Sequence, residues 1–315
     1  MVDRLLDEGH SVRVIDDLSG GRIANLDHHV GNKSLQIFVQ SINNDNNLEE
    51  IYGDLDYVFH FAGLGDIVPS INLPEAYLLA NSFGSAKVIC NLREHSPNLK
   101  KLVYAASSSC YGDDPVVPTS ERAPINLRYP YALSKFQGEQ SLLHLGKLYN
   151  LPVNSIRIFN AYGLRSRTSG AYGAVFGVFL KQKLSGKPLT VVGDGLQKRD
   201  FVYVTDVVDA FFRVSQIEEQ QEIFNLGCGN PVPVSRLVEL LGCDHVTIPD
   251  RPGEPRVTHA DNSKLVKATR WEPKISIEDG VGILVDHIDY WADAPLWEPS
   301  SIETATSAWF RAFSN

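Results

Sequence analysis

The chain has 315 residues, of which 43% are hydrophobic and 21% are charged, and its formal net charge is -9. This composition is typical of an ordinary globular protein, and the acidic balance without a basic cluster argues against a nucleic-acid partner. No run of about 18 apolar residues predicts a membrane span. The four cysteines have neither paired nor metal-like spacing, which predicts a reducing, cytoplasmic environment and no metal site.

Short β-rich runs alternate with helical segments through the first half of the chain. In chain order, the patterns predict a helix at 2–8, strands at 11–17, 35–42 and 56–63, a helix at 75–94, a strand at 100–109, a helix that carries Tyr131 and ends near Leu148, and a strand at 153–163. This alternation predicts an α/β fold, in which helices cover both faces of an open, mostly parallel sheet.

Small or polar residues stand where these predicted strands end. Open parallel sheets bind ligands at the carboxyl ends of their strands, so these residues are candidates for one binding edge. They are Asp16, Ala62 and Gly63, Ser107 to Ser109, and Phe159 with Asn160.

The stretch "YPYALSK" places Tyr131 and Lys135 four residues apart, on one face of the predicted helix. A protonated lysine beside a tyrosine favours the phenolate and lowers its pKa from about 10, so that the tyrosine can serve as a base near neutral pH. The serines at 107–109 offer a hydroxyl that could share this proton. Taken alone, both features also fit an ordinary surface helix and a serine-rich turn.

Asp16 ends the "VRVID" strand, where a carboxylate commonly accepts hydrogen bonds from the adenine ribose of NAD. It disfavours a ribose 2′-phosphate, so NAD is expected rather than NADP, although Arg22 lies nearby in the sequence. The alternative is an acid that caps a helix or a turn. Arg199 and Arg251 suit bidentate contacts with phosphate, while a lone surface arginine is more commonly only solvated.

The pattern changes after about residue 163, where a Gly/Ser/Arg loop occupies 163–173. We expect two interleaved domains that form a cleft. The first comprises 1–163 plus about 200–225, and the second, smaller and mixed α/β, comprises about 164–199 plus 226–315.

Nine stretches in order along nearly the whole chain resemble the extended short-chain dehydrogenase/reductases, close to the UDP-glucose and UDP-N-acetylglucosamine 4-epimerase family. The resemblance implies a Rossmann-type doubly wound parallel sheet with a smaller substrate domain, NAD as a resident cofactor, a nucleotide-sugar substrate and a homodimer. The stretches are "VIDDLSGG" (14–21), "VFHFAG" (58–63), Asn81 before Gly84, "SSSCYGD" (107–113), "YALSK" (131–135), "IRIFNAYG" (156–163), "VVGDGLQKRDFVYVTDVV" (191–208), "IFNLGCG" (223–229) and "RPGEPRVTHAD" (251–261).

The resemblance also implies a role for individual residues. Tyr131 is the catalytic base and acid, Lys135 binds the nicotinamide ribose and holds the tyrosine pKa down, and Ser107 matches the catalytic Ser/Thr, with Ser108 next in line. NAD binding is implied for Asp16, Asp17, Phe61, Ala62, Gly63, Asn81 and the backbone of Phe159. Substrate binding is implied for Asn160 at the nucleotide sugar, Arg199 and Arg251 at the diphosphate, Glu254 at the nucleotide ribose, and Thr258 as a gate beside the sugar.

The implied reaction is epimerisation at C4 through a 4-keto intermediate. Related dehydratases and decarboxylases carry an acid after the catalytic Ser/Thr, whereas Ser108 and Ser109 follow Ser107 here, which favours the epimerase. Thr258 is small, and at the gate a small residue admits a 2-N-acetyl group. A 4,6-dehydratase, a decarboxylase and an inactive NAD- or nucleotide-sugar-binding remnant stay as alternatives.

The family pattern opens with a strand and G-x-x-G-x-x-G, whereas this sequence begins in the helix that follows, so that roughly 18–20 residues of the pattern are missing. We expect the loss of this strand, central in the sheet, to leave neighbouring strand edges unpaired. A mis-assigned start and a true truncation both explain it. For the Trp-rich stretch at 287–313 we expect packing over the second domain rather than chemistry.

Overall fold

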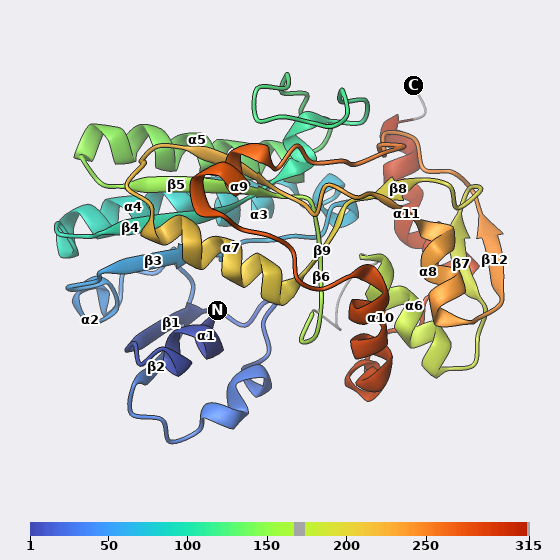
Figure 1. Ribbon diagram of the computed structural model, residues 1–315, viewed down its shortest axis with the longest axis horizontal. Coiled ribbons are helices and arrows are strands. Elements are labelled where there is room, and N and C mark those ends of the chain that lie inside the picture. The colour runs from blue at the N-terminus through green and yellow to red at the C-terminus, as the bar shows by residue number, and fades with distance from the viewer. Residues whose placement is uncertain (167–173, 314–315) are drawn as a thin grey trace.

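A parallel four-stranded sheet forms the centre of the computed structural model, which describes residues 1–166 and 174–313 (Figure 1). Its strand order is β10-β5-β4-β3, and neighbouring strands in it are parallel. The predicted α/β class with a parallel sheet is confirmed, with strands shorter than predicted by a few residues. The bounds are β3 Tyr57–His60, β4 Lys101–Ser107, β5 Val153–Ile158 and β10 Ile223–Leu226.

A separate parallel pair, β1 (Val12–Asp16) with β2 (Leu35–Val39), lies beside β3. In Figure 1 this pair is set apart from the edge of β3. Among the strands of the described residues, none joins β1 to β3. The expected interruption between these two strand edges is therefore present among the described residues.

Helices cover both faces of the four-stranded sheet. On one face α4 and α5 pack over Leu102, Tyr104 and Val153, and on the other α7 packs over Val103 and Ile156, in two separate buried clusters. The helices on the side of the four-stranded sheet are α1 Val2–Asp7, α2 Leu48–Tyr52, α3 Pro74–Tyr77, α4 Gly84–His95, α5 Pro130–Tyr149, α7 Val204–Gln216 and α9 Ser263–Thr269. Short 3-10 helices in the same part of the chain are η1 Ile23–His29, η2 Val68–Ile71 and η4 Ser108–Tyr111.

The single helix predicted at 75–94 is interrupted. A π-helical stretch, η3 (Leu78–Phe83), stands between α3 and α4. π-helical turns widen the backbone and are frequent at functional sites. Here the stretch contains the buried Asn81, whose side chain holds a neighbouring loop.

The second half of the chain builds another buried cluster, around Phe179, Leu237 and Leu284. Its strands pair as β6 with β9, β7 with β12 and β8 with β11. The bounds are β6 Asn160–Tyr162, β7 Leu189–Val192, β8 Lys198–Arg199, β9 Phe201–Tyr203, β11 Val232–Pro233, β12 His245–Ile248, α6 Val175–Leu184, α8 Val234–Leu241, α10 Ile277–Asp286, η5 Ile288–Trp291 and α11 Pro299–Phe313. Most of the predicted Gly/Ser/Arg loop lies outside the described residues.

The C-terminal helix α11 does more than cover the second half, which corrects the expectation for 287–313. Ile302 belongs to the second-half cluster, whereas Trp309 packs with Val68, Tyr129 and Ala132 of the first half. The helix therefore joins both halves.

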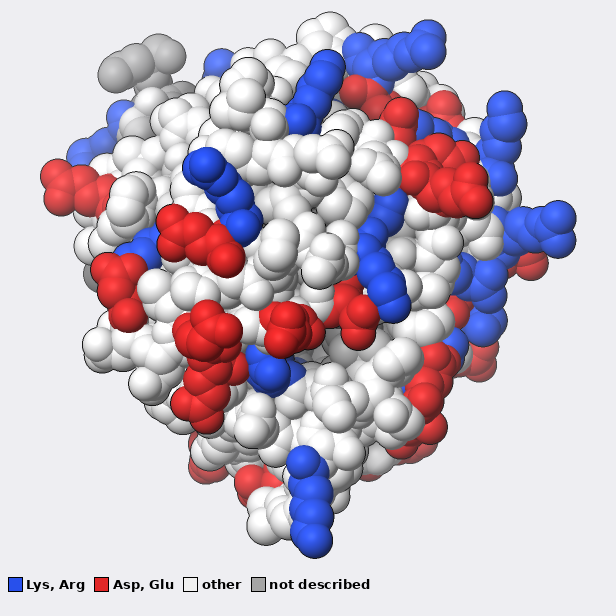
Figure 2. All heavy atoms as spheres, turned by 90° about the vertical axis from the view of Figure 1, so that its left-hand side faces the viewer, with Lys and Arg blue, Asp and Glu red and all other residues white. Residues whose placement is uncertain are grey.

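Acidic and basic side chains are interspersed on the face that Figure 2 shows, rather than gathered into a patch of one sign. Among the described residues, no helix combines the length and the apolar character needed to cross a bilayer.

Candidate active site

The serine run lies where β4 passes into η4. Ser107 is the N-cap of η4, and its Oγ accepts the Ser109 amide N–H at 3.2 Å. The two hydroxyls of Ser107 and Ser109 are 2.9 Å apart. This turn fixes the Ser107 side chain at the carboxyl edge of the sheet, as the sequence predicted.

Tyr131 and Lys135 lie on the first turns of α5, which begins at Pro130, a residue suited to the first helical position. The Tyr131 ring meets Tyr77 edge-on, with centroids 6.3 Å apart, and its hydroxyl is within hydrogen-bonding reach of Ser107. The predicted base and its hydroxyl partner are thus brought together from α5 and β4.

The lowering of the Tyr131 pKa by Lys135 stays a prediction, and the structure shows other groups that shift this pKa. Burial raises the pKa of Tyr131, and the nearby charge of Asp66 raises it too, while the hydrogen bond with Ser107 opposes them. Burial also lowers the pKa of Lys135 to about 7, although Glu139 acts to raise it. Burial thus shifts both residues toward their neutral forms.

Lys135 is held between a ring and a glycine. Its Nζ lies 4.5 Å from the centroid of the Tyr104 ring. Glu139, one turn further along α5, forms an ion pair with Arg157. Arg157 Nη2 donates to Glu139 Oε1 at 2.6 Å, and Arg157 Nε donates to Glu139 Oε2 at 3.0 Å. The Lys135 ammonium is therefore directed toward the edge of the sheet rather than into a salt bridge with Glu139.

Gly63 and Asn81 form a close cradle beside Lys135. The Asn81 amide donates to the Leu64 carbonyl at 3.0 Å and to Ser134 Oγ at 2.9 Å, and its Oδ1 accepts the Leu64 N–H at 2.8 Å. A Cβ on Gly63 would lie 2.4 Å from Asn81 Oδ1 and 3.8 Å from Lys135 Nζ, and Gly63 has a φ of +154°. Only glycine fits at this position, because any larger residue would displace the Asn81 side chain.

Asp16 is the last residue of β1, and Asp17 follows it. Asp16 Oδ1 accepts the Leu18 N–H at 2.7 Å, and Asp17 Oδ1 accepts the Ser19 N–H at 2.9 Å. A Cβ on Gly21 would approach Asp16 Oδ2 to 2.9 Å, so the chain passes close over this carboxylate. Both acids thus shape a tight loop at a strand end, which suits a carboxylate that binds a ribose.

Phe61 and Ala62 continue β3 at the same edge, next to Gly63. The Phe61 side chain is 42% exposed while its ring contacts Phe211 at a centroid distance of 4.8 Å. An aromatic ring half open at a strand end offers apolar surface to a planar ligand. These features, with the glycine cradle, fit the binding of NAD.

Arg199 and Arg251 converge on one carboxylate. Glu254 Oε1 lies 2.7 Å from Arg251 Nη1, and Glu254 Oε2 lies 3.4 Å from Arg199 Nη2. The two guanidinium groups therefore share one carboxylate. Arg199 also donates to the Pro255 carbonyl at 2.8 Å, and burial lowers its pKa. Two partly buried guanidinium groups that lie close together suit a bound diphosphate.

Thr258 and Asn160 are tied to each other. Thr258 Oγ1 donates to Asn160 Oδ1 at 2.7 Å and accepts the Asp200 N–H at 3.1 Å. The Phe159 N–H donates to the Leu226 carbonyl at 2.9 Å, so a backbone contact from Phe159 to a ligand has to use its carbonyl.

A cavity of about 400 Å³ joins these groups. Among the predicted residues, it is lined by Ser107, Ser108, Tyr131, Phe159, Asn160, Arg199, Arg251, Glu254 and Thr258. The predicted cofactor residues are not in its lining, so the predicted site has two parts; these residues are Asp16, Asp17, Phe61, Ala62, Gly63, Asn81 and Lys135.

Asp66 and Trp309 are among the residues of the cavity wall that sequence reasoning missed. Asp66 follows the end of the strand predicted at 56–63, and this position could have marked it as a candidate for the site. Trp309 is far along the chain in α11, and nothing in its local sequence points to a site.

The parallel sheet, the Tyr/Lys/Ser group at its carboxyl edge and the glycine cradle define an enzyme of the short-chain dehydrogenase/reductase type. The model of the NAD dependent epimerase/dehydratase family matches residues 1–227. The chain belongs to this family, and it is an NAD-dependent enzyme.

Curated and solved relatives agree with this assignment. UDP-glucose 4-epimerase of Mycolicibacterium smegmatis is 32% identical over 296 residues, covering 91% of this chain and 93% of the relative. The structure of UDP-glucose 4-epimerase from Thermotoga maritima with UDP-glucose has a TM-score of 0.83 at 30% identity, covering 93% of this chain and 94% of that one.

Two further structures carry other sugars. UDP-N-acetylglucosamine 4-epimerase from Methanobrevibacter ruminantium M1, in complex with UDP-N-acetylmuramic acid, has a TM-score of 0.83 at 29% identity. UDP-glucuronic acid 4-epimerase from Bacillus cereus, with UDP-glucuronic acid and NAD, has a TM-score of 0.82 at 26% identity. In both comparisons, 91% of this chain and 94% of the other are covered.

Proposed function

We propose that this enzyme interconverts the C4 epimers of a UDP-hexose or UDP-N-acetylhexosamine through a 4-keto intermediate. The observation that carries the proposal is one cavity that is lined both by the Tyr131 and Ser107 hydroxyls and by the arginine pair Arg199 and Arg251. A sugar held by its diphosphate at the arginines reaches the tyrosine with its ring.

In the proposed mechanism Tyr131 takes the proton from the sugar 4-hydroxyl while Ser107 hydrogen-bonds the same oxygen. A bound NAD⁺ would supply the acceptor for the C4 hydride and the donor for its return. The ketone turns within the cavity between these two events, and Tyr131 then gives the proton back on the other face. Gly63, Asn81 and Lys135 hold the nicotinamide side, and Asp16 with Asp17 hold the adenosine side.

Burial of Tyr131 raises its pKa, so that less of the phenolate is present near neutral pH, although the phenolate that forms is a stronger base. The hydrogen bond from Ser107 partly offsets this cost by supporting the phenolate. Both residues are needed in the proposed reaction, because the first half requires a base and the second half requires an acid at the same oxygen.

Two observations bear on the sugar. Thr258 is small and lines the cavity, which leaves space beside the sugar for a 2-N-acetyl group. Ser108 and Ser109 line it next to Ser107, at the position where related dehydratases and decarboxylases carry an acid, and this supports epimerisation over those reactions. The interleaved domain boundaries, the homodimer and the cytoplasmic location stay predictions.

Product analysis tests the proposal. The purified chain is incubated with NAD⁺ and with UDP-glucose, UDP-N-acetylglucosamine and UDP-glucuronic acid in turn, and the sugar nucleotides are separated by chromatography. We expect the C4 epimer of at least one of the first two and no net change of NAD⁺. Tyr131→Phe should lower the rate at least about 100-fold.

Three results contradict the proposal. A 4-keto-6-deoxy product indicates a dehydratase, and released CO₂ indicates a decarboxylase. No turnover by a folded chain at saturating NAD⁺ indicates the inactive binding remnant.

The gate assigned to Thr258 has its own prediction. Thr258→Tyr should reduce turnover of the N-acetylated substrate about tenfold or more while sparing the unsubstituted hexose, because the ring fills the space beside C2. The measurement is kcat/KM for both substrates. A variant that keeps full activity on the N-acetylated sugar contradicts the gate.

A further inference from the structure

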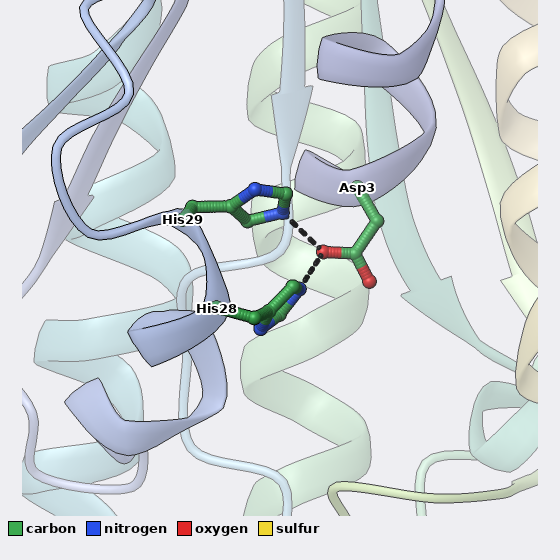
Figure 3. A group of neighbouring side chains, drawn as sticks. All are labelled: Asp3, His28 and His29. Carbon is green, nitrogen blue, oxygen red and sulfur yellow. Dashed lines mark hydrogen bonds and ion pairs between the residues drawn. The ribbon is translucent and has the colours of Figure 1, made fainter.

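A cluster of three metal-ligating side chains lies away from the cavity, between α1 and the end of η1. Asp3 comes from the first turn of α1, and His28 and His29 are the last residues of η1. Figure 3 shows both imidazole rings directed at the Asp3 carboxylate. The mechanism proposed above uses none of these residues.

In both histidines the Nε2 atom lies within hydrogen-bonding distance of the same carboxylate oxygen of Asp3. Asp3 Oδ1 lies 2.9 Å from His28 Nε2 and 2.8 Å from His29 Nε2, and the three ligand atoms all lie within 4.8 Å of one another. With metal–ligand bonds of about 2.1 Å, adjacent ligands are about 3.0 Å apart in octahedral and about 3.4 Å apart in tetrahedral coordination. The two separations from Asp3 Oδ1 are close to an octahedral edge, and the third, between the two imidazole nitrogens, is at most 4.8 Å.

The cluster is accessible but not fully solvated. The His29 side chain is 12% exposed, against 49% for His28 and 36% for Asp3. An ion could reach the three ligands from the His28 side, and water would complete its coordination.

Arg165 fixes the carboxylate from its other side. Its Nη2 lies 2.7 Å from Asp3 Oδ2, and its Nη1 donates to the Asn25 carbonyl at 3.1 Å. This contact orients Asp3 as outer partners orient metal ligands, and it leaves Oδ1 toward the imidazoles. It also cancels the carboxylate charge, so the cluster carries no net negative charge when both histidines are neutral.

The types of ligand atom in the cluster indicate which ions it can bind. Mg²⁺ and Ca²⁺ are bound by several oxygen ligands, commonly carboxylates, and this cluster has one carboxylate. Two imidazole nitrogens instead suit zinc, nickel, cobalt and copper ions. We propose that Asp3, His28 and His29 form a binding site for a first-row divalent transition-metal ion, with Zn²⁺ or Ni²⁺ as its probe, which ties η1 to α1.

Calorimetric titration of the full chain, free of any histidine tag, with ZnCl₂ and separately with NiCl₂ tests the site. We expect one ion per chain at micromolar concentrations, and at least about tenfold weaker binding in Asp3→Asn, His28→Gln and His29→Gln. His10→Gln is the matched control, because His10 is an exposed histidine 4.0 Å from Glu8 without a second imidazole.

Thermal unfolding gives a second readout that needs no turnover. An ion that binds the folded chain raises its midpoint, so Zn²⁺ should stabilise the wild type and His10→Gln but not His28→Gln. Equal binding by the wild type and all three ligand variants overturns the proposal. So does binding only at millimolar concentrations, and the cluster is then a hydrogen-bonded contact alone.

Discussion

Asp66 is the residue whose charge bears most directly on the choice of sugar. It lines the cavity with Tyr131, and its charge contributes to the raised pKa of that tyrosine. A carboxylate at the sugar side of the cavity repels a substrate that carries its own carboxylate. We therefore predict that uronic acids are disfavoured relative to neutral hexoses.

Asp66→Asn tests this repulsion. The substitution keeps the shape and removes the charge, so kcat/KM for UDP-glucuronic acid should rise about tenfold relative to that for UDP-glucose, which corresponds to about 1.4 kcal/mol. The measurement is the ratio of the two values in wild type and variant. Glu75→Gln, in the first turn of α3 and outside the cavity lining, is the control. An unchanged ratio in Asp66→Asn contradicts the assignment.

Lys135 predicts a pH-dependent stability. Its pKa is about 7 in the folded chain, against an ordinary value of 10.5. Between these values the unfolded chain holds a proton that the folded chain has lost, so the contribution of Lys135 to the free energy of unfolding rises with pH from about 7 to 10.5. Below pH 7 the buried charge costs the most.

Denaturant unfolding of wild type and Lys135→Met at a series of pH values checks this sign. The free energy of unfolding of the wild type should be lowest relative to that of the variant below pH 7. This deficit should shrink as the pH rises toward 10.5. Lys147→Met, an exposed position on the same helix, is the matched control. A difference that is constant with pH, or that grows with it, refutes the buried-lysine interpretation.

The sequence identified Tyr131, Lys135 and Ser107 but not their protonation. Spacing along a helix fixes which side chains share a face, whereas a pKa depends on burial by residues distant in the chain. Tyr131 is enclosed by Tyr77 and Ser107 from other elements, and the sequence pattern contains no measure of that enclosure.

At the scale of elements, helix α11 fixes the loop that carries Arg251. The Trp309 indole N–H donates to the Pro252 carbonyl at 2.7 Å, and a Cβ on Gly253 would lie 2.7 Å from the Phe313 ring. Gly253 has a φ of +79°, which glycine adopts without strain. The loop between the arginine and Glu254 is therefore held by two aromatic residues of one helix.

Trp309→Leu should loosen this loop and weaken substrate binding more than chemistry. We expect KM for the nucleotide sugar to rise about tenfold with kcat nearly unchanged, because the arginine pair must then be ordered on binding. Steady-state kinetics measure the split, and Phe310→Leu, on the same helix and outside the cavity lining, is the control. A fall in kcat at constant KM would mean that α11 acts on the reacting end instead.

The π-helical interruption at Asn81 marks the limit of prediction for elements. Periodicity predicted a continuous helix at 75–94, because the apolar spacing is helical on both sides of the break. The break accommodates the amide of Asn81, which bonds the backbone of Leu64 and the hydroxyl of Ser134. These partners lie 17 and 53 residues away, and a local pattern does not contain them.

At the scale of the whole molecule, the alternation of strands and helices predicted the parallel sheet and its ligand-binding edge. It did not predict that α11 would return to the first half of the chain, since one amphipathic helix fits either surface. The two parts of the site also differ in how firmly they are built: β4 and β5 are almost wholly buried, whereas β1 and β2 are mostly half exposed.

This difference predicts unequal local stability. The β1–β2 pair shares no hydrogen-bonded strand with the four-stranded sheet among the described residues, and it buries little apolar surface. Segments with few buried contacts open at a lower free energy than the core. In hydrogen exchange, the amides of β1 and β2 should therefore exchange well before those of β4 and β5.

NAD⁺ should change this pattern selectively. If Asp16 and Gly63 belong to one cofactor site, binding slows exchange in β1 and at residues 61–63 together, because a ligand of the folded state raises the free energy of every opening that breaks its site. NADP⁺ is the matched control, and its 2′-phosphate should be repelled by Asp16, giving weaker protection at the same concentration. Protection at 61–63 without protection in β1 would separate Asp16 from the cofactor site, and equal protection by NADP⁺ would remove its proposed selectivity.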